Sequence, residues 1–157
     1  MLRLSLQQKY AIRALVVIAG KGRKTRVQSR QIAEREGIPR KFLEQILADL
    51  REAGLVLSAR GKDGGYTLDR SAGEIRLRDI IEAFDGPLSL LPCLKPDDPA
   101  PPPCPDCQGT DECWIRGALA ETSELAVALL DRVTLADLCR RAESVKHATA
   151  DAFIYQI

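Results

Sequence analysis

The sequence predicts a mostly α-helical protein with one small β-hairpin, a winged helix-turn-helix domain followed by a C-terminal dimerisation helix. Three observations predict this fold class. Apolar side chains recur at helical spacing in three segments before Gly54, and two short strand-like runs flank a glycine-rich turn directly after it. Residues 114–133 then form a long segment without proline.

The first two helices are marked by apolar periodicity and by their end signals. Apolar residues at helical spacing predict a helix over Ser5–Ala19 with one apolar face. A basic linker, residues 21–26, leads to a short helix over Ser29–Glu36, in which we expect Ser29 to be the N-cap and Gly37 to end the helix.

The third helix follows after a tight turn. Pro39 stands where a helix can begin, and apolar residues continue at helical spacing until Gly54. The outward face of its first turns carries polar side chains that can reach base edges or phosphates. These residues are Arg40, Lys41, Glu44 and Gln45.

A β-hairpin is predicted next. Leu55–Arg60 and Tyr66–Asp69 are short strand-like runs, and residues 61–65 between them are rich in glycine. A helix-turn-helix followed by a hairpin is the order of a winged helix, which favours DNA binding over an ordinary α+β core that the hairpin merely covers. The DNA-facing residues of the hairpin tip would be Arg60, Gly61 and Lys62, with Ser29 added from the second helix.

Composition and charge agree with a soluble globular protein. The chain has 157 residues, 45% hydrophobic and 29% charged, which excludes a wholly disordered or collagen-like protein. No membrane span or secretory signal is evident in the sequence, so we expect a cytoplasmic protein with no membrane partner. Residues 1–70 carry 15 Lys and Arg against 7 Asp and Glu, which favours a polyanion-binding surface on that half.

The second half combines a cysteine loop with helices. A helix is predicted over Leu77–Phe84, and residues 87–113, which hold eight of the nine prolines and four of the five cysteines, predict an irregular functional loop. The helix over Trp114–Val133 is expected to dimerise, although it could pack on its own domain. We expect a short helix over Leu135–Cys139 and a last dozen residues that fray or pack on a partner.

These elements divide the chain into four parts. The expected parts are a DNA-binding domain at 1–86, the cysteine loop at 87–113, a dimerisation region at 114–138 and a C-terminal tail at 139–157.

The motifs resemble those of the IscR/NsrR family of bacterial winged-helix regulators. The resemblance rests on Ile32–Arg35, Phe42–Leu47, Ala53–Val56 and the Arg60-Gly61 to Gly64-Gly65-Tyr66 hairpin, and it extends to about Leu138. It implies a homodimer that binds a palindromic operator of double-stranded DNA, with an iron–sulfur cluster held by three cysteines before the dimerisation helix. In the resemblance, Glu44 matches a base reader and Arg60 matches a residue that enters the minor groove.

The loop cysteines are the candidate metal ligands. Four thiols within 21 residues, Cys93, Cys104, Cys107 and Cys113, can converge on one centre. Cys107 and Cys113 are separated by five residues, which is the gap that the family shows before its last cysteine. Cys93 lies further upstream than the family spacing would place it, and Cys104 is a cysteine additional to the family pattern. Where some relatives place a histidine as fourth ligand, this chain has Arg116. Cys104 is the candidate for the fourth ligand, because it would complete an all-thiolate set from a single loop.

Three interpretations of these cysteines stay open. They are an iron–sulfur cluster, with 2Fe–2S ahead of 4Fe–4S, a structural zinc ion, and a metal-free thiol switch in which Cys104 and Cys107 form a disulfide. Cys139 is expected to be a buried small hydrophobic residue. We predict a regulator that senses iron, redox or nitrosative state and is not an enzyme; the alternative from another class is a small electron-transfer iron–sulfur protein.

Overall fold

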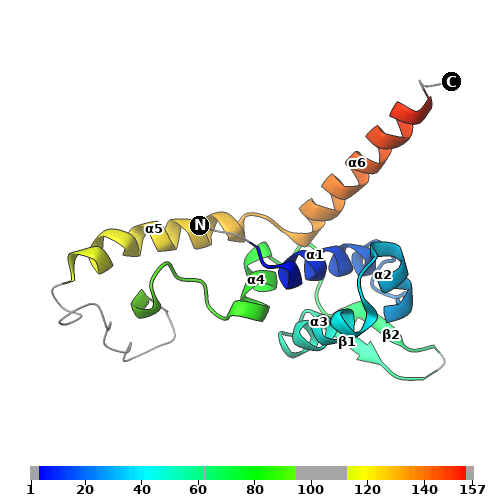
Figure 1. The fold of residues 1–157 in the computed structure, drawn as a ribbon, viewed down its shortest axis with the longest axis horizontal. Coiled ribbons are helices and arrows are strands. Elements are labelled where there is room, and N and C mark those ends of the chain that lie inside the picture. Colours follow the sequence, from blue (N-terminus) through cyan, green and yellow to red (C-terminus); the bar gives the residue numbers. More distant parts are fainter. Residues whose placement is uncertain (1–3, 62, 95–112, 155–157) are drawn as a thin grey trace.

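The structure, a computed structural model, describes residues 4–61, 63–94 and 113–154. The order of elements is α1 (Leu6–Ala19), α2 (Ser29–Glu36), α3 (Arg40–Glu52), β1 (Val56–Ala59), β2 (Gly65–Leu68), α4 (Leu77–Asp85), a 3₁₀ turn η1 (Pro92–Leu94), α5 (Trp114–Asp131) and α6 (Leu135–Ile154). Helices α1 to α4 and the hairpin pack together, and α5 and α6 project from them in different directions (Figure 1). The predicted fold class, mostly α with a hairpin wing, is confirmed.

Helix α1 lies at the centre of the packed unit. Ser5 caps it, because its Oγ accepts a hydrogen bond from the Gln8 N–H (3.1 Å) while Gln8 Oε1 accepts one from the Ser5 N–H (2.8 Å). Ala11 and Ala14 are completely buried, and their small side chains let neighbours come close. The helix therefore contacts α2, α3, α4, α6 and β2. The largest hydrophobic side chains of the resulting core are Leu15, Ile18, Ile32, Leu43, Ile46, Leu47, Leu50, Leu55, Ile75, Ile80 and Leu135.

The turn between α2 and α3 is set by two residues. Gly37 ends α2 in the left-handed conformation (φ 63°), which glycine adopts without steric cost. Ile38 follows, is buried in the core, and donates its N–H to the Ala33 carbonyl (3.0 Å). Pro39 then precedes the first residue of α3, as predicted.

The predicted N-cap of α2 is wrong by one residue. Gln28 precedes the helix in an extended conformation, and Gln31 Oε1 accepts a hydrogen bond from its N–H (3.2 Å). Ser29 is therefore the first helical residue. The N-cap is Gln28, and the side chain of the third helical residue, Gln31, accepts the hydrogen bond from its N–H.

The hairpin is fastened to the helices by a third segment. Strands β1 and β2 pair antiparallel, with Val56 opposite Leu68 and Ala59 opposite Gly65. Val27, in the linker before α2, exchanges two backbone hydrogen bonds with Tyr66 (3.0 and 2.9 Å). The backbones approach so closely that a Cβ on Gly65 would lie 2.8 Å from the Val27 carbonyl oxygen, and Gly65 has φ 149°. Glycine is required here for both reasons.

The segment after α4 is more regular than the predicted loop. The Leu88 N–H donates to Glu82 Oε1 (3.1 Å) at the end of α4, and the Leu90 N–H donates to the Ser123 Oγ (3.2 Å) of α5. The turn η1 follows and also contacts α5. Local partners on two helices thus order residues 88–94, and residues 95–112 lie outside the described part of the chain.

Helix α6 is longer than predicted and crosses the expected boundary at residue 139. It begins with a capping box in which the Thr134 N–H donates to Asp137 Oδ2 (2.8 Å) and the Asp137 N–H donates to Thr134 Oγ1 (3.1 Å). It then continues for 20 residues to Ile154. Alanines and the absence of Gly and Pro after Leu135 favour this length, whereas the weak apolar periodicity after Cys139 had suggested fraying. None of the helices in the described ranges combines the length and apolarity of a bilayer span.

Replacing Gly65 by Ala should lower the free energy of unfolding by about 1–3 kcal/mol, because the new Cβ would overlap the Val27 carbonyl at a strained backbone angle. Urea unfolding of the two proteins measures this difference. Gly73→Ala is the matched control, since nothing lies within 4 Å of a Cβ there and its φ is not positive. Equal stability of Gly65→Ala and wild type would show that the hairpin is not held by this close approach.

Candidate nucleic-acid interface

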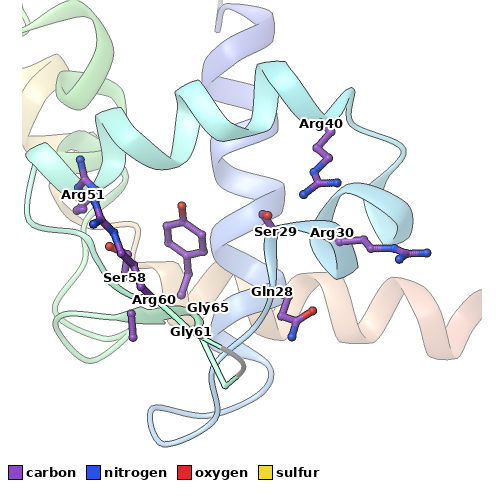
Figure 2. Close-up of a pocket in the computed structure, with 12 residues that line it drawn as sticks. Gln28, Ser29, Arg30, Arg40, Arg51, Ser58, Arg60, Gly61 and Gly65 are labelled. Carbon is purple, nitrogen blue, oxygen red and sulfur yellow. The ribbon is translucent and has the colours of Figure 1, made fainter.

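A concave surface lies between the hairpin and helices α2 and α3, with a cavity volume of about 530 Å³. Four arginines from α2, α3 and the hairpin line it, and no acidic side chain among the described residues does so (Figure 2). The lining residues are Gln28, Ser29, Arg30, Arg40, Arg51, Ser58, Ala59, Arg60, Gly61, Gly64, Gly65 and Tyr66. A surface of this sign and shape attracts a polyanion.

Helix α3 contributes an arginine at each end. Arg40 and Arg51 are eleven residues apart, which is about three turns, so they lie on the same face of the helix. Arg51 was not among the predicted residues because only the first turns of the helix had been considered. The helical period that placed Arg40 on the outward face also places Arg51 there.

Glu44 forms an exposed ion pair with Arg40. Arg40 Nε lies 3.2 Å from Glu44 Oε1, four residues further along α3. Exposed pairs of this spacing contribute only about 0.3–0.5 kcal/mol. A ligand can therefore separate the two side chains at little cost.

The first turn of α2 faces the same concave surface. Ser29 and Arg30 are its first residues, and the backbone N–H groups of a helix start favour an anion. Arg30 Nε lies 2.7 Å from Glu34 Oε1, and this contact raises the pKa of Arg30 above its ordinary value, mainly through the hydrogen bond. Figure 2 shows Ser29 and Arg30 on the side of the cavity nearest Arg40.

The hairpin tip forms the other side of the concave surface. Arg60 is exposed, and its side chain forms no hydrogen bond or ion pair with the described residues. Gly61 has φ 104°, and a Cβ on Gly64 would lie 2.6 Å from the Ala59 carbonyl oxygen, so glycine is needed at both positions of this turn. Lys62, also predicted for this surface, lies outside the described residues.

Not all predicted residues meet in the cavity. The structure brings together Ser29, Arg40, Arg60 and Gly61. Lys41, Glu44 and Gln45 are exposed on α3 but do not line the cavity. The amide of Gln45 donates to Asp49 Oδ1 (2.8 Å), so this side chain is engaged on the helix surface.

The structure describes two of the four predicted loop ligands. Cys93 lies in η1 and Cys113 directly precedes α5, and both are half-buried. Cys104 and Cys107 lie outside the described residues. In the described part of the chain, no three His, Cys, Asp or Glu side chains converge on a possible metal position.

Cys139 is separate from this set. It is half-buried on α6, packed against the core, rather than fully buried as predicted. Burial, with a smaller effect of Glu143, raises the pKa of its thiol above the ordinary value. Since the thiolate is the metal-binding and reactive form, this environment favours a packing role.

The fold and the arginine-lined surface together define the class of protein to which this chain belongs. A helix-turn-helix with an exposed third helix, a hairpin wing and an arginine-lined surface between them is the architecture of a winged-helix DNA-binding protein.

The chain belongs to the Rrf2 family, whose model, described as an iron-dependent transcriptional regulator, matches residues 4–141. It is therefore a DNA-binding transcription regulator and, as predicted, not an enzyme. An rrf2-like HTH-type transcriptional regulator from Rhodobacter capsulatus is 39% identical over 135 residues, covering 84% of this chain and 89% of the relative.

The solved structures similar to this one include two regulators. IscR from T. potens has a TM-score of 0.67 and 30% identity, covering 92% of this chain and 90% of that one. CymR, the global cysteine regulator of B. subtilis, has a TM-score of 0.68 and 29% identity, covering 90% and 98%. The predicted resemblance to IscR-type regulators is thereby confirmed.

Replacing Glu44 by Ala should relax discrimination at one base pair per half-site by about 1–3 kcal/mol. A carboxylate repels phosphate, so its benefit near DNA comes from accepting a hydrogen bond from a cytosine amino group. The change also frees Arg40, so non-specific affinity should stay equal or rise. Binding to a selected operator and its single-base-pair variants, at two salt concentrations, measures both quantities.

Glu34→Ala is the matched control, because it frees Arg30 from an equivalent pair on α2 without touching α3. It should leave the discrimination between base pairs unchanged. A uniform loss of affinity across all sites for Glu44→Ala would mean that Glu44 supports the helix rather than reads a base.

Proposed function

We propose that this chain is a homodimeric regulator that binds a palindromic operator and senses iron, redox or nitrosative state through an iron–sulfur cluster in its cysteine loop. The arginine-lined surface between α3 and the wing carries the DNA-binding part of the proposal. In this proposal Arg40, Lys41 and Lys62 bind phosphates, Arg60 enters the minor groove and Glu44 reads a base. Ser29, Gln45 and Gly61 complete the contacts.

An exposed stripe on α5 supports the dimer. Ile115, Ala118, Thr122, Leu125 and Leu129 follow one another at alternating spacings of three and four residues, and all are exposed. Leu125 is 60% and Leu129 62% exposed. The spacing is that of a coiled-coil seam, and the opposite face of the helix is already covered by residues 88–94 and α4. A second copy of α5 would bury this stripe about a two-fold axis.

The donor set of the loop fits an iron–sulfur cluster. The half-buried Cys93 and Cys113 border the segment that contains Cys104 and Cys107, so all four thiols belong to one continuous stretch of chain. Thiolates are the ligands that hold such clusters. The cluster, when bound, supplies reactivity toward oxidants and nitric oxide together with dependence on iron supply.

The cysteine segment is connected to α4 and α5 at its N-terminal end and continues directly into α5 at its C-terminal end. Residues 88–94 are tied to α4 through Glu82 and to α5 through Ser123, and α5 carries the proposed dimer stripe. Loaded and empty dimers would therefore hold the two recognition helices at different separations. A coupling of about 1–3 kcal/mol, five- to 150-fold in affinity, suffices for control.

A thiol switch or a structural zinc ion in the same loop is the second candidate. The structural similarity to CymR, the global cysteine regulator of B. subtilis, favours the thiol chemistry. Two residues separate Cys104 and Cys107, a spacing compatible with a small disulfide or with half of a zinc site.

Anaerobically purified protein should be coloured and contain iron with acid-labile sulfide. Replacing Cys93, Cys107 or Cys113 by Ala should remove both, because each loses a thiolate ligand, whereas Cys139→Ala is the control that should retain them. Elemental analysis and the visible spectrum are the measurements. Stoichiometric zinc without iron, or a metal-free protein that forms a Cys104–Cys107 disulfide, would replace the cluster with one of the alternatives.

The double variant Leu125→Glu, Leu129→Glu should be monomeric, because burying unpaired carboxylates in an apolar seam is strongly unfavourable. Sedimentation velocity measures the oligomeric state. The control variant Leu125→Met, Leu129→Met keeps the stripe apolar and should remain dimeric. An unchanged dimer in the glutamate variant would place the interface elsewhere.

A further inference from the structure

The linker between α1 and α2 is a concentrated basic segment outside the surface described above. Residues 21–26, which we call the basic linker, comprise Lys21, Gly22, Arg23, Lys24, Thr25 and Arg26. Four of the six are cationic, none is acidic and all are exposed. The core does not require these charges, because the neighbouring Val27 makes the buried contact with the hairpin.

The basic linker lies on the far side of the wing from α3. It forms, with the hairpin, a second concave surface of about 590 Å³, to which Arg23, Lys24 and Arg26 contribute. Gly64 and Gln28 line both this surface and the arginine-lined one, so the hairpin is the ridge between the two. The wing therefore has cationic side chains on both of its flanks.

The four cations of the basic linker divide into two pairs. Arg23 Nη2 donates to the Asp69 carbonyl (3.4 Å) and Arg26 Nη1 donates to the Asp63 carbonyl (3.3 Å), so these arginines brace the hairpin on either side of β2. The side chains of Lys21 and Lys24 form no hydrogen bond or ion pair with the described residues. The lysine ammonium groups are available to a ligand.

The acidic groups near the basic linker do not neutralise it. Asp63 is the single carboxylate among the described residues that line the second concave surface. Glu74 lies nearby, and hydrogen bonds from Ser71 lower its pKa, with a smaller effect of the Arg23 charge, so it stays ionised. No carboxylate of the described residues lies within ion-pair distance of Lys21 or Lys24.

We propose that the basic linker is a second phosphate-binding site, which contacts the DNA backbone beyond the groove that the wing enters and so extends the contact past each half-site. The proposal rests on the proposed placement of α3 and the wing on DNA. A minor groove is about 6 Å wide and is walled by one backbone strand on each side. The strand nearer α3 faces the arginine-lined surface, and the other strand faces the basic linker. Lysine suits this role because it binds phosphate as a point charge without base preference.

The proposal makes affinity depend on flanking DNA of any sequence. Each phosphate contact contributes about 0.9 to the log–log salt slope, which at 0.1 M salt corresponds to as much as about eightfold in affinity. Two lysines per protomer would add this effect only on duplexes long enough to reach them.

The test compares duplex length and variant together. The full-length wild-type protein first selects a site from a randomised duplex library, and this site is then made with no flanks and with random-sequence flanks of about one helical turn, about 10 bp, on each side. The double variant Lys21→Ala, Lys24→Ala removes four contacts from a dimer, so on the long duplex its salt slope should fall by up to about 3.6 and its affinity should be lower than that of wild type by at least about tenfold. It should bind the short duplex like wild type, and its preference among single-base-pair variants should be unchanged.

The control Arg141→Ala removes one exposed charge from α6, which projects away from the wing (Figure 1), and should behave like wild type on both lengths. The variant Arg26→Ala, which removes a brace, should weaken binding on both lengths because the wing is released. An equal loss on short and long duplexes for the lysine variant, or no loss on either, would overturn the proposal. If wild type selects no preferred sequence, the proposed placement on DNA fails, and the salt slope on a long random duplex still decides whether the lysines bind phosphate.

Discussion

The burial of α1 is the constraint on which the rest of the structure depends. Ala11 and Ala14 are fully buried on a helix that touches α2, α3, α4, α6 and β2, so one element fixes the positions of nearly all the others. Larger side chains at these alanines would force the surrounding helices apart, and interiors packed at close to crystal density tolerate such insertion poorly. The orientation of α3, and with it the face presented to DNA, is thus determined from inside the domain.

The wing is held against the same core by a small number of backbone contacts. A two-stranded hairpin has marginal stability alone. Here the hydrogen bonds between Val27 and Tyr66, made possible by the missing side chain of Gly65, add a third backbone segment, and Leu68 and Val56 are buried beneath it. The arginine-lined surface exists because the hairpin is held at a fixed distance from α3. The basic linker is positioned by the same pairing, since it immediately precedes Val27.

Sequence patterns predicted the elements whose signals are local and strong. The helix-turn-helix follows from apolar periodicity and Gly37, and the hairpin follows from its glycines, so these elements were placed within one or two residues. The length of α6 was missed because apolar spacing, the signal used, fades after Cys139, although the alanines and the absence of Gly and Pro after Leu135 were present in the sequence. The side of the wing on which the basic linker lies, and the meeting of Arg51 with the hairpin, depend on tertiary contacts that no single segment encodes.

A polar contact links the two halves of the chain. Gln8 is 1% exposed, and its amide donates to Asp85 Oδ2 (2.7 Å) at the last residue of α4, directly before the segment that leads to the cysteines. A buried amide left without a partner costs about 1–3 kcal/mol, so this contact resists separation of α1 from the end of α4. Glu82, one turn earlier on α4, holds the Leu88 N–H. Helix α4 is packed against both α1 and α3. A displacement of the cysteine segment would therefore move α4, and this movement would displace α1 and α3.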